Sequence, residues 1–309
     1  MGSWRSPFAD GGAAYASAMR IRPALLILLI VTALASLGLV DGVTFTPRST
    51  PSAGAAWTEA STWRTTGHTK ITVAGATLRD KPVDRLSHYI AAVQVAAVAD
   101  EELTDLTIAF QEQVARDGEK ADELGLDGIA VQILGLPGDR SFARADGSRL
   151  KRKQKKWLDQ QFGGSADDDG VDPLTFLLKD EPMTVGATWD MDLEAIGEYF
   201  DPSRFRFDVA ASKATATLVD VRDWHGVQAG HFTFDVLLVP NWIKDGEIRN
   251  AKMHIVGTAD LPVDGSQPWQ AFDVQTELVF DGWVKRKGVK ADVDLTMQFS
   301  GKESHLPPS

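Results

Sequence analysis

The segment HFTFDVLLV, residues 231–239, decides the fold class because every second position in it carries a large apolar side chain. In an extended chain these apolar residues share one side, and they are Phe232, Phe234, Val236 and Leu238. A period of two residues is typical of a strand that buries one face and exposes the other. Antiparallel sheets commonly have one dry and one solvated face, so the segment predicts an antiparallel β structure.

Three nearby segments repeat this pattern: RFRFDV (204–209), FDVQTELVF (272–280) and DVDLTMQF (292–299). Their apolar positions are Phe205, Phe207, Val209, Phe272, Val274, Leu278, Phe280, Val293, Leu295, Met297 and Phe299. Turn signals separate the runs, and they stand at Asp223–Gly226, Asp245-Gly246, Asp264-Gly265, Asp281-Gly282 and Lys287-Gly288. We therefore expect a β unit across residues 182–301.

A first β unit is predicted across residues 57–135. Residues 88–114 contain two alternating runs around an acidic turn. Residues 101–117 also contain the Glu, Gln and Ala that favour a helix. The strand is the preferred interpretation because Leu106, Ile108 and Phe110 occupy every second position.

The phrase EPMTVGATWDMDLEAI, residues 181–196, places a proline, a glycine and a tryptophan before an alternating run. A shorter version, PSAGAAW, ends at Trp57. We expect each phrase to mark the entry of the chain into a sheet; a true duplication and a coincidence of strand-edge residues both remain open. Alternation would put three acidic side chains on one solvated strand face rather than in an acid–base site: Asp190, Asp192 and Glu194.

Residues 136–181 predict a helical connector. One helix is expected in ADGSRLKRKQKKWLDQQF, with Asp146 as its N-cap, and a second begins at Pro173 and ends before Pro182. Between them GGSADDDGVD is an acidic loop. Its aspartates are consecutive and lack the closing glutamate of an EF-type loop, so no calcium site is expected.

Together these patterns predict a mainly β protein. Strands with one apolar and one solvated face must form a curved or covered sheet, so that the apolar face is removed from water. We expect curved antiparallel sheets that form a half-barrel or a sandwich, with two short helices in the middle of the chain.

Residues 19–40 predict either a cleaved signal peptide or a retained membrane anchor. Arg20 and Arg22 precede an apolar run, and Ala33-Leu34-Ala35 has the form of a signal-peptidase site. The uncharged run 23–40 is also just long enough to span a bilayer. Both alternatives place the rest of the chain across the cytoplasmic membrane, in the periplasm or outside the cell.

Three further segments flank the predicted units. Residues 1–18 are either a disordered tail or the result of a misassigned start, residues 41–56 form a linker, and residues 302–309 form a tail. The chain of 309 residues has a formal net charge of −11, which argues against a nucleic-acid partner. It contains no cysteine, so disulfides and zinc–thiolate sites are excluded.

The sequence offers no recognisable catalytic or metal motif. The histidines, at 68, 88, 225, 231, 254 and 305, form no HExxH or H-x-H pair. His225 and His231 flank an expected hairpin bend and could approach each other, but a zinc site needs a third ligand. No G-x-S-x-G, P-loop or G-x-G-x-x-G sequence occurs. We therefore predict no catalytic residues, no metal and no cofactor.

The second phrase and the hairpin after it resemble a family of uncharacterised exported bacterial proteins with a P-x-x-V-G-x-x-W motif and a following G-x-x-A-x-x-F strand. The matching residues are Pro182, Val185, Gly186, Trp189, Gly226, Ala229 and Phe232. The resemblance covers the last third of the chain. It implies a secreted or surface-tethered β-rich protein and no catalytic residues.

The favoured hypothesis is an envelope protein that binds an apolar ligand, a lipid or a protein partner without catalysis. The residues expected to line such a ligand are Trp189, Phe205, Phe207, Phe232, Phe234 and Phe280. The alternatives are a hydrolase of envelope polymers and a structural or assembly module. A basic run predicts contact with anionic surfaces through Arg149, Lys151, Arg152, Lys153, Lys155 and Lys156, with Trp157 as an interfacial anchor or, alternatively, a solvated helix face.

Overall fold

The computed structural model describes residues 42–47, 50–99, 102–121, 124–163, 173–200, 202–265 and 269–308. The predicted signal peptide or anchor, the segment before it and the three aspartates of the acidic loop lie outside the described residues. Among the described residues, no helix is long and apolar enough to cross a membrane.

The protein is mainly β, with 63% of its described residues in strands, as the alternation predicts. The strands are β1 (Ala56–Val73), β2 (Ala76–Ala99), β3 (Glu102–Asp117), β4 (Lys120–Ala121), β5 (Ala130–Leu134), β6 (Ser141–Arg144), β7 (Thr188–Asp190), β8 (Phe205–Phe207), β9 (Lys213–Trp224), β10 (Val227–Leu238), β11 (Pro240–Ile243), β12 (Gly246–Pro262), β13 (Gln270–Arg286) and β14 (Val289–Leu306). The two α-helices are α2 (Arg152–Phe162) and α3 (Leu193–Tyr199), and η1 (Pro173–Leu177) is a 3-10 helix.

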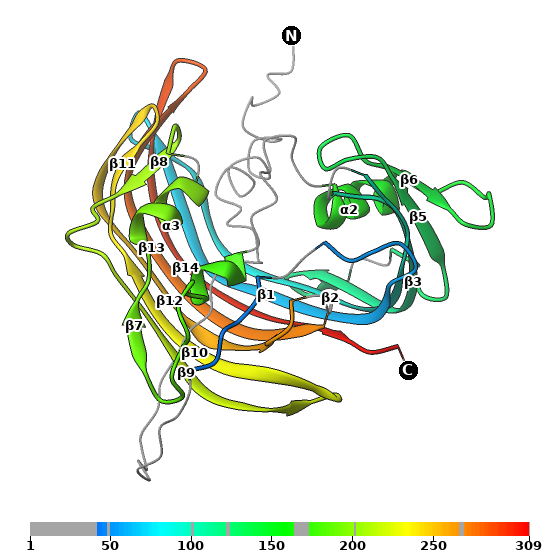
Figure 1. Cartoon of the computed structure of the whole chain (residues 1–309). Helices are drawn as coiled ribbons and strands as arrows, with labels where there is room; N and C mark the ends of the chain where they lie inside the picture. Colours follow the sequence, from blue (N-terminus) through cyan, green and yellow to red (C-terminus); the bar gives the residue numbers. More distant parts are fainter. Residues whose placement is uncertain are drawn as a thin grey trace.

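Twelve of the strands form one antiparallel sheet in the order β6-β5-β3-β2-β1-β14-β13-β12-β10-β9-β7, with β4 beside β3. β8 and β11 form a separate pair. Apart from β8 and β11, the strands of the two predicted β units therefore belong to one sheet. The units are joined because β1 pairs with β14 over fifteen aligned positions, from Thr58 and Leu306 to Thr72 and Asp292. The sheet is strongly curved and is not closed into a barrel (Figure 1).

Both α-helices lie inside the curve of the sheet (Figure 1), and we call the face that they cover the concave face. α3 and η1 pack on strands β9 to β14 and bury the larger core, in which Phe232 and Phe234 are at most 2% exposed. α2 packs on β2, β3 and β5 and buries the smaller core around Phe110 and Trp157. Each large side chain buried in this way contributes roughly 1.5–3 kcal/mol to stability.

Several segments differ from the sequence-based expectation. The alternation at 189–194 is not a strand face: β7 ends at Asp190, and Asp192 caps α3 by accepting hydrogen bonds from the backbone N–H groups of Glu194 and Ala195. The predicted N-cap of the first helix is also wrong, because α2 begins at Arg152 after Lys151. Asp146 instead accepts from the backbone N–H of Ser148 in a turn.

Asp281-Gly282 does not form the expected turn, because both residues lie inside β13 beside a register shift in β12. Hairpin turns are present at the expected positions 223–226, 245–246 and 287–288. Lys287 and Gly288 have the two positive φ angles of a type I′ hairpin turn, 48° and 82°. β14 continues to Leu306, so most of the predicted tail is strand. In the predicted linker, Phe45 is buried and packs edge-on against Phe232.

Candidate functional site

The six residues predicted to line an apolar ligand all belong to the larger core. Phe207, Phe232, Phe234 and Phe280 are buried in it, and Trp189 and Phe205 are partly buried against it. These rings pack mainly against one another and against apolar core side chains; Trp189, for example, meets Phe232 edge-on at 6.4 Å between centroids. Contact of these rings with a ligand stays a prediction.

The basic run forms one solvated surface. Its six basic residues are all exposed, on α2 and the turn before it, whereas Gln154, Trp157 and Leu158 face the core. Trp157 is 7% exposed and packs edge-on against Tyr89 and Phe110, so it cannot serve as the interfacial anchor that the sequence offered. Burial of its indole follows from the amphipathic spacing of the helix.

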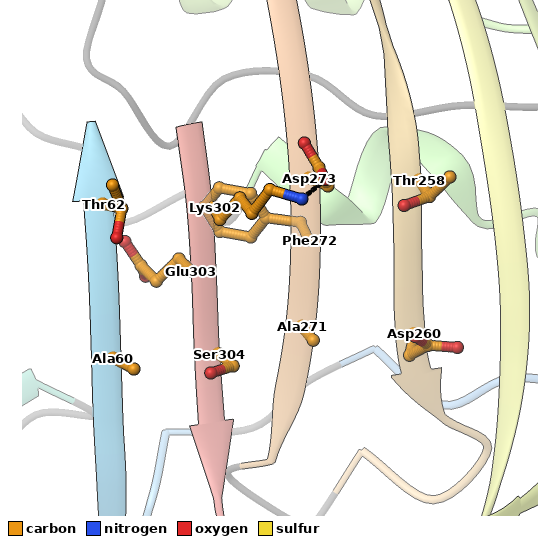
Figure 2. Close-up of a pocket in the computed structure, with 10 residues that line it drawn as sticks. All are labelled: Ala60, Thr62, Thr258, Asp260, Ala271, Phe272, Asp273, Lys302, Glu303 and Ser304. Atoms are coloured by element: carbon orange, nitrogen blue, oxygen red, sulfur yellow. Dashed lines mark hydrogen bonds and ion pairs between the residues drawn. The ribbon is translucent and has the colours of Figure 1, made fainter. Parts of the chain in front are cut away.

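A pocket of about 300 Å³ lies on the opposite, convex face of the sheet (Figure 2). Most of the side chains that line it from the convex face are polar or charged: Thr62, Thr258, Asp260, Asp273, Lys302 and Ser304, joined by Ala60 and Ala271. Phe272 and Glu303 border the pocket from the same strands, although they alternate with these residues and belong to the concave face. Lys302 forms an ion pair with Asp273 across the pocket. This surface is open and polar, and it does not suit an apolar ligand.

A buried polar cluster lies on the concave face of the central strands. Glu59 on β1 is the cross-strand partner of His305 on β14, and Glu303 stands two residues earlier on the same face. His305 Nε2 lies 3.5 Å from Glu59 Oε2 and 3.2 Å from Glu303 Oε1. The exposed fractions of the side chains are 12% for Glu59, 20% for Glu303 and 10% for His305. We call these three residues the Glu–Glu–His cluster.

Two aromatic side chains hold Glu59 in place. The Tyr89 hydroxyl on β2 donates a short hydrogen bond to Glu59 Oε1, and Trp57 Nε1 donates to Oε2 at 3.3 Å. The Trp57 ring also lies against the His305 imidazole, with 5.6 Å between ring centroids. Burial, together with the charges of Glu59 and Glu303, raises the pKa of Tyr89 well above its usual value. Its hydroxyl is therefore a permanent donor at neutral pH.

The cluster sits at the junction of the two cores. Trp57 and Tyr89 belong to the smaller core, whereas Trp63, six residues along β1, packs against the larger one. Trp63 Nε1 donates to the buried Ser61 hydroxyl at 2.9 Å, which extends the polar network along β1. Three acid–base side chains with oriented neighbours can bind a cation or exchange protons.

The two histidines that were expected to approach each other do not form a pair. His231 Nδ1 lies 2.9 Å from Asp260, which also accepts a hydrogen bond from Arg222. His225 occupies the hairpin turn and packs edge-on against Trp224. Elsewhere His68 pairs with Asp80 and His254 with Asp235, each at 2.8 Å across neighbouring strands. The His68 and His254 pairs are exposed and the His231 contact is partly buried, and none of these contacts brings together three ligand groups.

Sequence reasoning missed the Glu–Glu–His cluster, although two signals for it exist. Glu59 occupies an every-second-residue position between Trp57 and Ser61, on a face that the tryptophans mark as buried. Glu303 and His305 are also two residues apart, but they fell within the predicted tail. Only the pairing of β1 with β14 brings the two segments together, and a single sequence does not reveal that pairing.

No family model matches the chain, and no curated protein sequence matches it. A match among solved structures is an outer membrane channel from Pseudomonas putida F1, with 8% sequence identity and a TM-score of 0.19. The alignment covers 88% of this chain and the whole of the channel chain. A TM-score this low does not define a shared fold.

Proposed function

We propose that this is an exported, non-enzymatic binding protein of the bacterial envelope, and that it holds an apolar ligand of the lipid class on the concave face of its sheet. The observation that carries the proposal is a strip of partly exposed apolar side chains on the central strands. Trp63 on β1 and Met297 and Phe299 on β14 pack against the larger core but are not fully buried. A bound acyl chain would remove this remaining apolar surface from water.

The position of the strip supports a ligand site rather than an ordinary core. It lies on the strands where β1 meets β14, in the centre of the sheet, whereas the most deeply buried rings lie under α3 and η1 on one side and α2 on the other. A curved sheet that is apolar on its inner face is a common setting for an apolar site. The sequence features of residues 19–40 support the envelope location.

The proposal is tested with a pair of adjacent substitutions. Phe299→Glu puts a charge on the concave strip, and Ser300→Glu puts the same charge on the exposed convex face of the same strand. Protein purified from cells is extracted with organic solvent, and the extracted lipids are identified and quantified by mass spectrometry. Delipidated protein is then titrated with a fluorescent fatty acid.

We expect lipid in the wild type and in Ser300→Glu, and saturable fatty-acid binding that is weakened at least about tenfold in Phe299→Glu, since burying an unpaired charge costs several kcal/mol. Equal binding by both variants would place the ligand elsewhere and contradict the proposal. A wild-type protein that neither carries lipid nor binds the probe would overturn it in favour of a protein partner or a structural role.

A further inference from the structure

We propose that the Glu–Glu–His cluster is a binding site for a divalent transition metal, with zinc as its natural class of ligand. Glu59, Glu303 and His305 each offer one ligand atom, and these three atoms lie within 4.8 Å of one another. The inference does not depend on the apolar ligand, because it concerns different side chains of the same concave face.

The distances within the cluster fit a metal better than direct hydrogen bonds. A charge-assisted N–H···O bond is about 2.7–2.9 Å long. The imidazole Nε2 is instead 3.5 Å from Glu59 and 3.2 Å from Glu303. Tetrahedral zinc with bonds of about 2.0–2.2 Å to nitrogen and oxygen separates its ligand atoms by about 3.3–3.6 Å. The two distances from the imidazole thus match edges of such a coordination shell, and the two carboxylates lie within 4.8 Å of each other.

Charge and burial favour a cation at the same position. Two carboxylates lie together on a largely buried face, where like charges repel strongly. Among the described residues, the basic side chain that lies near both carboxylates is His305. The neighbouring Lys302 points to the convex face and pairs with Asp273. A divalent ion would neutralise both carboxylates at once.

The surrounding groups provide the orientation that metal ligands need. Tyr89 donates to Glu59 Oε1 and Trp57 donates to Oε2, so the carboxylate is fixed from two sides and retains free lone pairs. The Trp57 ring restricts the plane of the His305 imidazole. Groups that contact metal-ligating side chains in this way hold the ligands in place and raise the affinity for the metal. Glu303, the most exposed of the three at 20%, marks the side from which an ion would enter.

The donor set selects the metal. Calcium and magnesium prefer oxygen ligands, whereas one imidazole and two carboxylates suit zinc and its neighbours in the first transition row. Three protein ligands leave a fourth tetrahedral position for water or another molecule. A site on two paired strands adds the rigidity of the sheet, and it would connect β1 to β14 at the centre of the fold.

The test uses untagged full-length protein that has been stripped with a chelator and titrated by calorimetry with zinc chloride, and separately with magnesium and calcium chloride. Glu303→Gln removes one ligand charge at constant size. His254→Gln is the matched control, because His254 pairs with Asp235 outside the cluster. Cobalt(II) replaces zinc in a parallel sample, where visible absorption distinguishes tetrahedral from octahedral coordination.

We expect one zinc per chain, little heat from magnesium or calcium, and the intense visible bands of tetrahedral cobalt. Glu303→Gln should weaken zinc binding at least about tenfold and abolish the rise in Tm that zinc produces, whereas His254→Gln should behave as the wild type. The absence of saturable zinc binding, an equal loss in both variants, or octahedral cobalt would each overturn the proposal. The cobalt spectrum of the wild type decides the question even if Glu303→Gln fails to fold.

Discussion

The indole of Trp63 on β1 lies directly over Gly301, its cross-strand partner on β14. A Cβ atom at residue 301 would come within 2.0 Å of the Trp63 ring carbon Cζ3, so only glycine fits beneath the indole. Phe234 covers its own cross-strand partner Gly257 in the same way. Large side chains folded over glycines allow a long sheet to bend while its concave face stays filled.

Gly301→Ala should destabilise the protein by about 1–3 kcal/mol, the usual cost of overpacking a filled site. The matched control is Gly197→Ala in α3, where the new methyl group would meet Phe207 at an ordinary 3.4 Å. That variant should be neutral or stabilising, because alanine favours a helix over glycine by about 1 kcal/mol. Urea denaturation measures both, and equal midpoints for the two variants would refute this account of Trp63.

Tyr89→Phe should cost about 1.5–3 kcal/mol at neutral pH, because a buried carboxylate loses one of its donors. The pKa of Tyr89 is raised in the folded state, so the stability that it contributes is present below pH about 10 and is lost as pH rises towards the folded pKa. The difference between wild type and Tyr89→Phe should therefore shrink in alkaline solution. Urea midpoints at pH 7 and pH 11 test this, and a constant difference would contradict it.

Asp192→Ala should destabilise the protein by about 0.5–2 kcal/mol, since Asp192 accepts from two free N–H groups at the start of α3. Asp192→Asn should retain most of the cap. Asp190→Ala removes a nearby exposed aspartate that lies in β7, and it serves as the control. Thermal melts of the four proteins should place only Asp192→Ala clearly below the wild type.

Asp260 should contribute to loss of stability in acid. Partial burial tends to raise the pKa of Asp260, but the hydrogen bond and charge of His231 and the charge of Arg222 outweigh it and lower the pKa. A lowered pKa gives stability above the unfolded value of about 4, and this stability is lost as pH falls through the folded value. In denaturation series from pH 6 to pH 2, Asp260→Asn should show a shallower decline than the wild type; parallel curves would argue against this linkage.

The basic surface of α2 should bind anionic lipid. Replacing Arg152, Lys155 and Lys156 with glutamine should reduce the fraction of protein that sediments with vesicles rich in anionic lipid. The binding free energy should weaken by about 1 kcal/mol for each charge removed. A control that replaces the exposed lysines 70, 81 and 120 removes equal charge from β1, β2 and β4. Binding of the wild type should weaken as salt increases. Equal losses in the two triple variants would show a general charge effect only.

The period-two pattern predicted the strands well because burial on one face is a local property of the sequence. Phe232, Phe234 and Phe280 are buried where alternation placed their strands. The same pattern failed at 189–194, where Asp192 serves as a helix cap; local hydrogen bonding overrode the alternation there. Asp281 and Gly282 do not form a turn but continue β13, opposite a register shift in β12. Residues that favour turns are also tolerated at such irregularities in a sheet.

The order of the strands could not be predicted, and the candidate sites depend on it. Glu59 and His305 become neighbours only through the register of β1 and β14, a non-local relation that neither composition nor spacing encodes. The basic surface of α2 was identified from the sequence, because a charged helix face is a local pattern. Trp157 was misassigned to that surface because a tryptophan beside six cations suits either face until the helix is placed on the sheet.

The pairing of β1 with β14 also sets the order in which the molecule can assemble. β1 gains one neighbour, β2, from the next segment of the chain, but its other edge is filled by the last strand of the sheet. During synthesis, that edge is open until β14 arrives, and an open edge invites pairing with other chains. The centre of the sheet is therefore completed last, and slow, non-local folding with a need for protection by chaperones is the kinetic consequence.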